Sequence, residues 1–287
     1  MDLRQPLRDL VTLTKPSITG MNVLMALGGV ALAKTGAEPR LLAATAIGTG
    51  LAVASANALN MVLEREGDKH MARTAGRPLP TGRMTAKTAT LFGVTLGLIS
   101  LAVLATINLL TMGLGLFALL SYVLVYTPLK RKTPAALAIG AIPGAMPPLM
   151  GWTAATGSIE LPGLVLFGIL FVWQLPHFIA IALFRKDDYG RAGIKTVPVV
   201  RGDQVAKAQA IAWSSALLVI SLMLVPLQIA GWLYGAVAAV LGVWYLVWSL
   251  RGLKRDAGVP WARKYFFASL VYLPALTLAL AVDVALL

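Results

Sequence analysis

Nine long apolar runs, separated by short charged loops, are the feature that most limits how this chain can fold. Each run has about 17 to 24 residues, enough for a helix to cross a hydrocarbon core of roughly 30 Å at about 1.5 Å per residue. The third and fourth runs are separated only by Asn108 or its neighbours. The sequence therefore predicts an all-α fold, a polytopic membrane helix bundle of about nine transmembrane helices. The predicted spans cover residues 17–33, 41–63, 88–107, 109–127, 134–156, 162–184, 206–226, 230–250 and 265–286.

The composition supports a membrane protein and excludes other classes. Hydrophobic residues make up 58% of the 287 residues, charged residues make up 13%, and the mean hydropathy is +0.78, a balance foreign to soluble domains. The net charge of +13 would suit a nucleic-acid-binding protein, but the cations lie in short loops between apolar runs. We therefore expect no nucleic-acid partner. Because the chain has no cysteine, disulfides, thiolate metal sites and thiol nucleophiles are excluded.

The distribution of lysine and arginine among the loops predicts the orientation in the membrane. With the N-terminus in the cytoplasm, 23 of these cations fall in cytoplasmic segments and two, Lys34 and Arg40, fall outside. This bias follows the positive-inside rule and requires an odd number of spans. The first residues lack the layout of a signal or transit peptide, since Asp2 and Asp9 interrupt them. We expect a multi-pass protein of the bacterial plasma (inner) membrane, inserted through its own first helix.

Two cytoplasmic loops carry acids as well as bases, which topology alone does not explain. The acids are Glu64, Glu66 and Asp68 in residues 64–87, and Asp187, Asp188 and Asp203 in residues 185–207. Acidic residues contribute little to membrane orientation, so they need another role. Because four spans separate the two loops, we predict one domain over residues 1–287 with two pseudo-repeated halves, each with one acidic loop on the cytoplasmic side.

The first acidic loop has the residue types and the spacing of a magnesium site. Asn60, Glu64 and Asp68 are four residues apart, so they lie along one face of a helix. An amide oxygen and two carboxylates suit Mg²⁺, which proteins usually hold with one or two carboxylates together with substrate phosphates. We predict these three residues to be metal ligands and catalytic residues. Asn57, one turn before Asn60, is a candidate to join them as a substrate-binding residue.

Arginines follow these acids within a few residues. Arg73, Arg77 and Arg83 are of the type that pairs with phosphate oxygens, and we predict that Arg73 and Arg77 bind diphosphate. The alternative is a solvated helix end whose charges pair at i and i+4. The asparagines argue against it, because Asn57 and Asn60 lie inside an apolar span, where polar groups usually serve a function.

The whole first motif resembles that of the intramembrane prenyltransferases of the UbiA superfamily. Residues 60–83 follow the pattern NxxxExxxDxxMxRTxGRPLPTGR, an Asn- and acid-rich helix end followed by RTxxRPL. The resemblance covers the second and third spans directly, and the nine-span count extends it to the whole chain.

The second half resembles one branch, the protohaem IX farnesyltransferase (haem O synthase) family. Residues 126–157 read YTPLKRKTPAALAIGAIPGAMPPLMGWTAATG, and residues 173–202 read WQLPHFIAIALFRKDDYGRAGIKTVPVVRG. The W-PHF, KDDY-AGI and PVV-G elements carry the likeness. The sequence departs at Gln174-Leu175, where the family often has Thr-Pro, and at Lys195-Thr196, where Pro-Met is common. Its second acidic motif is also thinner than the superfamily's DxxxD.

This resemblance implies a reaction and a set of residues. The reaction is transfer of a farnesyl group from farnesyl diphosphate to a vinyl group of haem b, with Mg²⁺ as cofactor, to make haem O. Haem A synthase or a terminal oxidase is the implied downstream partner. The second loop would assist the chemistry: Asp187 and Asp188 as metal-binding and catalytic residues, Arg191, Lys195 and Tyr189 as contacts to phosphate.

Two further residues are candidates for substrate contact. His177 lies within a predicted span, where histidine is rare, and we predict that it binds haem, as iron ligand or as a positioning group. Its alternative role is a hydrogen bond between helices. Lys130 belongs to the run PLKRKT, which is either a topological stop signal or a substrate contact. Tyr189 has a similar alternative, as an interfacial belt tyrosine.

Other functions stay open at this point. A quinone-pathway prenyltransferase acting on 4-hydroxybenzoate would share the first motif, although the W-PHF and KDDY-AGI elements argue against it. A secondary transporter also has polar residues at broken helices, but here they cluster at the cytoplasmic boundary and not at the midplane. A non-catalytic haem carrier would not need the Asn60, Glu64 and Asp68 stripe.

Overall fold

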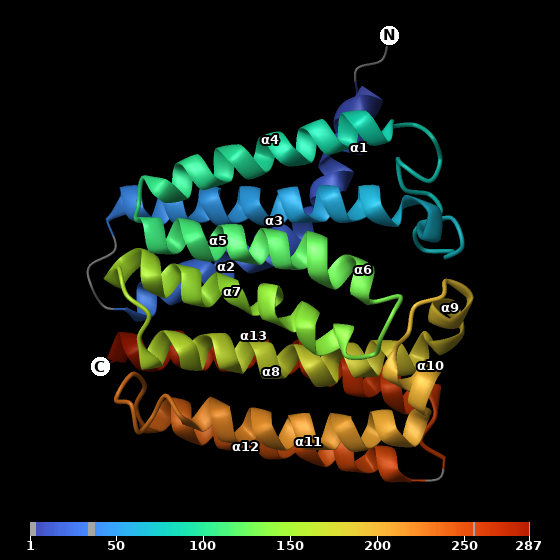
Figure 1. Ribbon diagram of the computed structural model, residues 1–287. Helices are drawn as coiled ribbons and strands as arrows, with labels where there is room; N and C mark the ends of the chain where they lie inside the picture. The colour runs from blue at the N-terminus through green and yellow to red at the C-terminus, as the bar shows by residue number, and fades with distance from the viewer. Residues whose placement is uncertain (1–3, 34–37, 255, 287) are drawn as a thin grey trace. The chain divides into compact units, whose positions relative to one another are not determined.

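The computed structural model describes residues 4–33, 38–254 and 256–286, and every regular element in these ranges is helical (Figure 1). The predicted all-α class is confirmed for this part of the chain. Lys34, one of the two cations assigned above to the outside, lies beyond the described residues.

Most helices follow one another with short connections, and a longer one, residues 69–85, joins α3 to α4. Along the chain they are α1 (Arg4–Thr14), α2 (Pro16–Leu32), α3 (Pro39–Asp68), α4 (Ala86–Ala105), α5 (Leu109–Leu120), the π-helix η1 (Ser121–Tyr126), α6 (Thr127–Leu129), α7 (Ala136–Thr156), α8 (Leu161–Phe184), α9 (Lys186–Arg191), α10 (Val197–Arg201), α11 (Asp203–Leu222), α12 (Trp232–Leu250), the 3-10 helix η2 (Arg251–Leu253) and α13 (Val259–Leu286).

Seven segments within the described residues are long and apolar enough to cross a membrane, so this is a multi-pass membrane protein. They are α3, α4, the continuous stretch Leu109–Leu129, α8, α11, the stretch Trp232–Leu253 and α13. Each of the nine predicted spans overlaps one of these segments or one of two further helices. Those two are α2, which is apolar but only 17 residues long, and α7, which contains Pro143, Pro147 and Pro148.

Side-chain caps define two of the helix starts. Thr85 accepts a hydrogen bond from the backbone nitrogen of Thr88 at 3.1 Å and begins α4, and Asn108 accepts one from Thr111 at 2.7 Å and begins α5. Short polar side chains favour this position because they satisfy backbone donors that the helix leaves free. Asn108 is thus the break between the third and fourth predicted spans.

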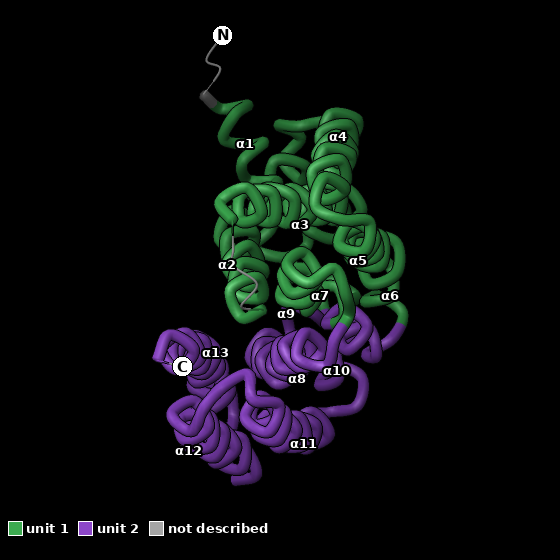
Figure 2. Tube along the Cα trace, turned by 90° about the vertical axis from the view of Figure 1, so that its left-hand side faces the viewer, with its two compact units in different colours: residues 1–132, 142–159, 191–194 green, residues 133–141, 160–190, 195–287 purple. Residues whose placement is uncertain are grey.

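The chain divides into two compact units (Figure 2). Unit 1 comprises Met1–Lys132, Ile142–Ile159 and Arg191–Ile194. In it, α3 packs against α1, α2, α4 and α5. Helices α2 and α7 approach closely at Gly29 and Gly151, where an added Cβ would overlap the backbone of Pro148 and of Ala26, respectively. Small residues at such crossings allow helix backbones to touch.

Unit 2 comprises Thr133–Ala141, Glu160–Gly190 and Lys195–Leu287, and its long helices α8, α11, α12 and α13 pack on one another. Its interior is rich in buried tyrosine, and the hydroxyls of Tyr265 and Tyr272 bond to Ser214 at 2.6 Å and Ser221 at 2.9 Å. Asp283 accepts hydrogen bonds from backbone nitrogens at the start of α12, which satisfies the free donors of that helix.

Candidate active site

Helix α3 carries the first acidic motif at its C-terminal end, in unit 1. The helix continues five residues beyond the predicted apolar limit at residue 63 and ends at Asp68. Asn57, Asn60, Glu64 and Asp68 are all buried along it, with exposed fractions of 4%, 3%, 7% and 1%. Glu66, on another face of the same turn, has a side chain 65% exposed. The stripe of four polar residues therefore faces the protein, as the spacing predicts.

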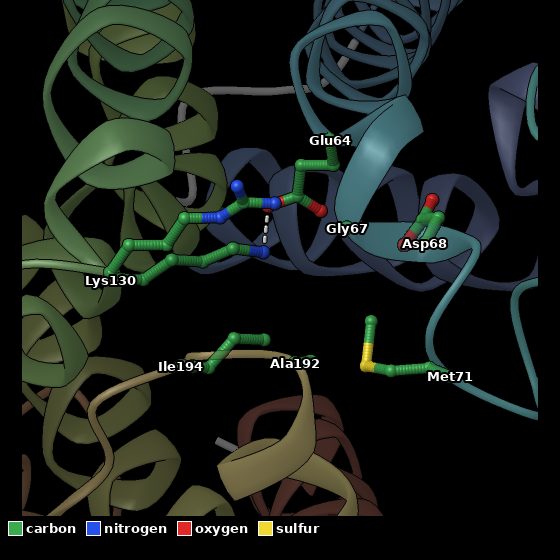
Figure 3. A pocket seen from close by; sticks show the side chains of 8 residues that line it. Glu64, Gly67, Asp68, Met71, Lys130, Ala192 and Ile194 are labelled. Atoms are coloured by element: carbon green, nitrogen blue, oxygen red, sulfur yellow. Dashed lines mark ion pairs between the residues drawn. The ribbon is translucent and has the colours of Figure 1, made fainter.

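A small pocket opens beside this helix end (Figure 3). Glu64 and Lys130 point toward each other across it and form an ion pair, while Met71, Ala192 and Ile194 line another part of it. The full lining is Glu64, Gly67, Asp68, Met71, Lys130, Arg131, Ala192 and Ile194. Lys130 of the PLKRKT run is therefore beside the first acidic motif and not in a remote loop.

Asp68 is held in place from both its side chain and its backbone. Arg77 Nη1 donates to Asp68 Oδ2 at 2.7 Å, and the Thr74 hydroxyl donates to the Asp68 carbonyl oxygen at 2.8 Å. These bonds fold the residues after α3 back toward the helix end. Asp68 Oδ1 is buried with no hydrogen-bond partner among the described residues. Such an oxygen is costly to bury unless a further ligand satisfies it.

Asn60 has its amide orientation fixed by its neighbours. The Thr127 hydroxyl donates to Tyr122 O at 2.8 Å, so its oxygen accepts from Asn60 Nδ2 at 3.1 Å. This leaves Asn60 Oδ1 as the acceptor, and Lys15 Nζ approaches it at 3.4 Å. Thr127 directly follows the π-helix Ser121–Tyr126, an irregularity that often occurs at functional sites.

The other arginines and Asn57 have different surroundings. Asn57 Nδ2 donates to the carbonyl oxygen of Thr14 at 3.3 Å, which ties the turn between α1 and α2 to α3. Arg73 is exposed. Arg83 pairs with Asp9 of α1 at 3.2 Å and also donates to Gly76 O at 3.1 Å, so it braces the loop.

Burial, together with the positive charges around this pocket, lowers the pKa of two lysines. Burial and then the nearby cations Lys15 and Arg131 lower the pKa of Lys130 to about 7. Burial and then Arg77 lower the pKa of Lys15 to about 8; Asp68 opposes this shift and Arg73 adds to it. An anionic ligand would relieve this repulsion.

The donor set of unit 1 fits a hard divalent cation bound together with phosphate. Within the described residues, no three His, Cys, Asp or Glu side chains group closely enough to hold a metal ion unaided. The predicted ligands Asn60, Glu64 and Asp68 supply one amide oxygen and two carboxylates. Of these groups, Asp68 Oδ1 is an oxygen that still needs a partner. Mg²⁺ commonly binds to such a partial set and takes its remaining ligands from substrate phosphate and water.

His177 lies in unit 2, on α8, in an aromatic setting. Its ring stacks on Trp173 with 4.7 Å between centroids and lies 4.8 Å from Phe266. Its Nδ1 is 2.7 Å from the hydroxyl of Ser269, which donates its own hydrogen to Phe266 O at 2.6 Å. The Ser269 oxygen therefore accepts from Nδ1–H, and the Nε2 atom of a neutral imidazole keeps its lone pair.

The second acidic motif forms the short helix α9. Asp188 pairs with Arg185 at 3.2 Å, and Lys186 of the same helix pairs with Asp203 at 2.7 Å. Asp187 is exposed. Tyr189 is partly buried, and Arg191 and Lys195 are exposed. Four residues of the second loop belong to unit 2: Asp187, Asp188, Tyr189 and Lys195. Their predicted contacts to metal and phosphate stay predictions.

Sequence reasoning did not select several residues that the structure places at these sites. Lys15, Thr127 and Arg131 join the first motif, and Ser269 joins His177. Lys15 did carry a signal, because the pair Lys15-Pro16 directly before the first apolar run also fits the protohaem IX farnesyltransferase family. Ser269 gave none, because it lies 92 residues from His177 in an apolar helix.

Comparison with known proteins agrees with this picture. The model of the UbiA prenyltransferase family matches residues 22–271. The chain is 49% identical to a protoheme IX farnesyltransferase of Myxococcus xanthus, over 96% of this chain and 94% of that protein. It is 46% identical to one of an Anaeromyxobacter species, over 95% of this chain and 92% of the relative.

Solved structures share the fold at low sequence identity. A structure from a study of digeranylgeranylglyceryl phosphate synthase has a TM-score of 0.85 at 16% identity, covering 99% of this chain and all 100% of the other. A UbiA homolog from Archaeoglobus fulgidus, bound to GPP and Mg²⁺, has a TM-score of 0.70 at 17% identity, covering 95% and 99%. From the family match and the relatives together, this chain belongs to the UbiA prenyltransferase family.

Proposed function

We propose that this protein transfers the farnesyl group of farnesyl diphosphate to a vinyl group of haem b and so makes haem O. The observation that carries the proposal is the buried pair Glu64 and Asp68, surrounded by Lys15, Arg77 and Lys130. This arrangement offers ligands for a cation and for a diphosphate at once. The acceptor follows from the relatives named protoheme IX farnesyltransferase, which match over nearly the whole chain.

The setting of the enzyme is part of the proposal. We place the chain in the bacterial inner membrane with nine spans, its N-terminus and the loops 64–87 and 185–207 on the cytoplasmic side. The bias of lysine and arginine supports this orientation. We treat residues 1–287 as one intramembrane domain with two pseudo-repeated halves. Haem O would then pass to a haem A synthase or terminal oxidase in the same membrane.

Asn60, Glu64 and Asp68 would hold Mg²⁺ through Asn60 Oδ1 and the two carboxylates, with Asp187 and Asp188 as further candidates. The solved relative with GPP and Mg²⁺ bound supports this ion. When bound, Mg²⁺ supplies charge that stabilises the departing diphosphate. Arg73, Arg77 and Lys130 of unit 1 would bind diphosphate oxygens, with Arg191, Lys195 and Tyr189 as candidates from the second loop.

The protein's own part in the chemistry is to neutralise charge and to exclude water. Cationic side chains fixed before the reaction stabilise the negative charge that grows on diphosphate as the allylic C–O bond breaks. The allylic cation left when diphosphate departs then needs an apolar surrounding until the terminal vinyl carbon of haem b adds to it. Water adds to the cation that this leaves on the haem side chain and loses a proton, which gives the hydroxyethylfarnesyl group. His177, with Nδ1 held by Ser269, would present Nε2 to haem.

A product assay tests the proposal. Membranes that contain the protein receive haem b, farnesyl diphosphate and Mg²⁺, and the extracted haems are analysed by mass spectrometry. We expect haem O that depends on Mg²⁺ and disappears in Asp68→Ala. If a parallel reaction gives prenylated 4-hydroxybenzoate and no haem O is formed, the family assignment stands and the acceptor is 4-hydroxybenzoate, not haem b. If folded protein makes neither haem O nor prenylated 4-hydroxybenzoate, the proposal is overturned.

A further inference from the structure

The connection between α12 and α13 carries a cluster of cations at a membrane boundary (Figure 1). Residues 251–264 lie where one segment able to cross a membrane ends and the next begins. Asp256 is the acid among them, and four of the cations are exposed: Arg251, Lys254, Arg263 and Lys264. The positive-inside rule accounts for such charge, but it does not account for the way in which this connection is packed.

The end of α12 packs directly on the start of α13. Gly252 lies against the ring of Trp261, and a Cβ added at Gly252 would overlap that ring. The indole nitrogen of Trp261 also donates to the carbonyl oxygen of Trp248 at 3.0 Å. Each of the four exposed cations lies within three residues of Gly252 or of Trp261. This contact therefore brings cations of two different segments to one junction.

A lysine of α11 fixes the same junction from inside the protein. Lys207 is 7% exposed, and its Nζ donates to the carbonyl oxygen of Ala257 at 2.6 Å. The ammonium group lies 5.6 Å from the centre of the Trp261 ring, within the range of a cation–π contact. Lys207 and Trp261 thus hold the connection in one arrangement, so that little further ordering is needed when a ligand binds to it.

Apolar side chains flank the cations, and the cations have no acidic partners. Leu250, Leu253 and Val259 are exposed. The guanidinium carbon of Arg251 lies 4.7 Å from the centre of the Trp248 ring, a stacking that leaves the N–H groups at its edge able to donate. In the part of the chain that the structure describes, none of the four cations forms an ion pair with a carboxylate. A ligand with negative charge beside apolar chains would complement this surface.

We propose that residues 251–264 bind the headgroup of an anionic phospholipid of the surrounding membrane. The phosphodiester oxygens accept hydrogen bonds from the cations, and the acyl chains lie along Leu250, Leu253 and Val259. Lipid fits better than free phosphate, because the apolar side chains and the membrane boundary act together with the charge. This role is separate from prenyl transfer, since the surface belongs to unit 2 and includes none of the residues assigned to metal, diphosphate or haem.

Lipid binding to the purified full chain tests the inference. The protein in detergent is titrated with dioleoyl phosphatidylglycerol, or with zwitterionic dioleoyl phosphatidylcholine, and bound lipid is counted by native mass spectrometry. We expect the parent to bind phosphatidylglycerol more tightly. The double variant Arg251→Gln with Lys254→Gln should weaken this binding roughly 20-fold, since each cation near an anionic lipid contributes about fivefold.

The matched control is the double variant Lys87→Gln with Arg201→Gln. It also removes one lysine and one arginine, both exposed in other loops, so the net charge falls by the same amount. We expect its affinity for phosphatidylglycerol to stay within about twofold of the parent. Equal losses in the two double variants would overturn the inference, because net charge and not this surface would then attract the lipid.

Gly252→Ala tests the geometry with every charge in place. The added methyl group meets the ring of Trp261, so the two segments should separate and the affinity for phosphatidylglycerol should fall at least about fivefold. Parental affinity in this variant would overturn the inference. The thermal unfolding midpoint shows whether the variant is folded, and if it is not, the two double variants decide, because their substitutions are at exposed positions.

Two results with the parent protein would also reject the proposal. One is equal affinity for phosphatidylglycerol and phosphatidylcholine, which would show that the negative charge of the headgroup is not recognised. The other is complete displacement of phosphatidylglycerol by inorganic phosphate, which would show that the surface takes a free anion and gains nothing from the acyl chains.

Discussion

Arg77 donates to one oxygen of Asp68 across 2.7 Å, while the second oxygen is buried without a hydrogen-bond partner in the described part of the chain. The arginine holds the carboxylate at a fixed angle and leaves one oxygen for another ligand. We infer that Arg77 orients Asp68 in addition to its predicted contact with diphosphate.

Removal of the Asp68 carboxylate should therefore abolish most activity. We expect Asp68→Ala to lower the rate of haem O formation at least about 100-fold. The variant removes a ligand of the metal ion, and that ion offsets the negative charge that develops on diphosphate. Glu66→Gln is the matched control, because Glu66 is exposed on the same helix and pairs with Lys69. Rates within about twofold of the parent for Asp68→Ala, measured at saturating Mg²⁺, would contradict the metal assignment.

The ion pair between Glu64 and Lys130 allows a test by exchange of charges. The double variant Glu64→Lys with Lys130→Glu keeps an ion pair in the pocket but moves the carboxylate from α3 to the segment after α6. If the pair serves only to hold the fold, this variant should turn over like the parent. We expect a thermal unfolding midpoint near that of the parent and a loss of haem O formation. Parental turnover would show that neither residue binds substrate or metal.

Gly67 lies under the guanidinium of Arg131, where an added Cβ would overlap the end of that side chain. We expect Gly67→Ala to push Arg131 out of the pocket without unfolding the protein, because a long side chain can move aside. Gly67→Ala and Arg131→Ala should then weaken binding of farnesyl thiolodiphosphate, an unreactive analogue of farnesyl diphosphate, to a similar degree. The double variant should bind this analogue no more weakly than either single variant. Additive losses would mean that the two residues act separately.

The contact of α2 with α7 predicts a strong effect of small changes. Gly29→Ala should destabilise unit 1 by at least about 1–3 kcal/mol, since the new methyl group would meet backbone atoms that cannot rotate away. Gly28→Ala is the control, because no atom lies within 4 Å of the corresponding Cβ position. Thermal unfolding in detergent measures both, and equal midpoints would contradict the close crossing.

His177→Ala should impair the use of haem and spare that of prenyl diphosphate. We expect roughly tenfold weaker binding of haem b and a shifted absorption spectrum of the bound haem, with the affinity for farnesyl thiolodiphosphate unchanged. His70→Ala provides the control, because it is the other of the two histidines and is exposed. Unchanged haem affinity and an unchanged spectrum would leave His177 with a structural hydrogen bond to Ser269 alone.

The helices were predictable from hydropathy, and their ends less so. The predicted span 162–184 agrees with Leu161–Phe184, where apolar side chains extend to both ends of the helix. The predicted spans 41–63 and 265–286 are parts of the longer helices Pro39–Asp68 and Val259–Leu286. Hydropathy records where apolar side chains end, whereas backbone hydrogen bonding continues through turns that carry charge.

The candidate site was predictable where its residues follow a local spacing. Asn60, Glu64 and Asp68 repeat every fourth residue, so helical geometry alone places them on one face. Lys15 and Thr127 reach Asn60 across 45 and 67 residues, and no local pattern encodes contacts of that separation. The π-helix before Thr127 was not predictable either, since its residues SYVLVY read as ordinary apolar helix.

The Gly29 and Gly151 crossing also has a practical use. Because backbone meets backbone there, the distance between α2 and α7 does not depend on side-chain rotamers or on solvent. Spin labels or fluorophores placed on exposed positions of these two helices should report one sharp distance at every stage of turnover. That pair of labels would serve as an internal ruler, against which movement measured elsewhere in unit 1 can be calibrated.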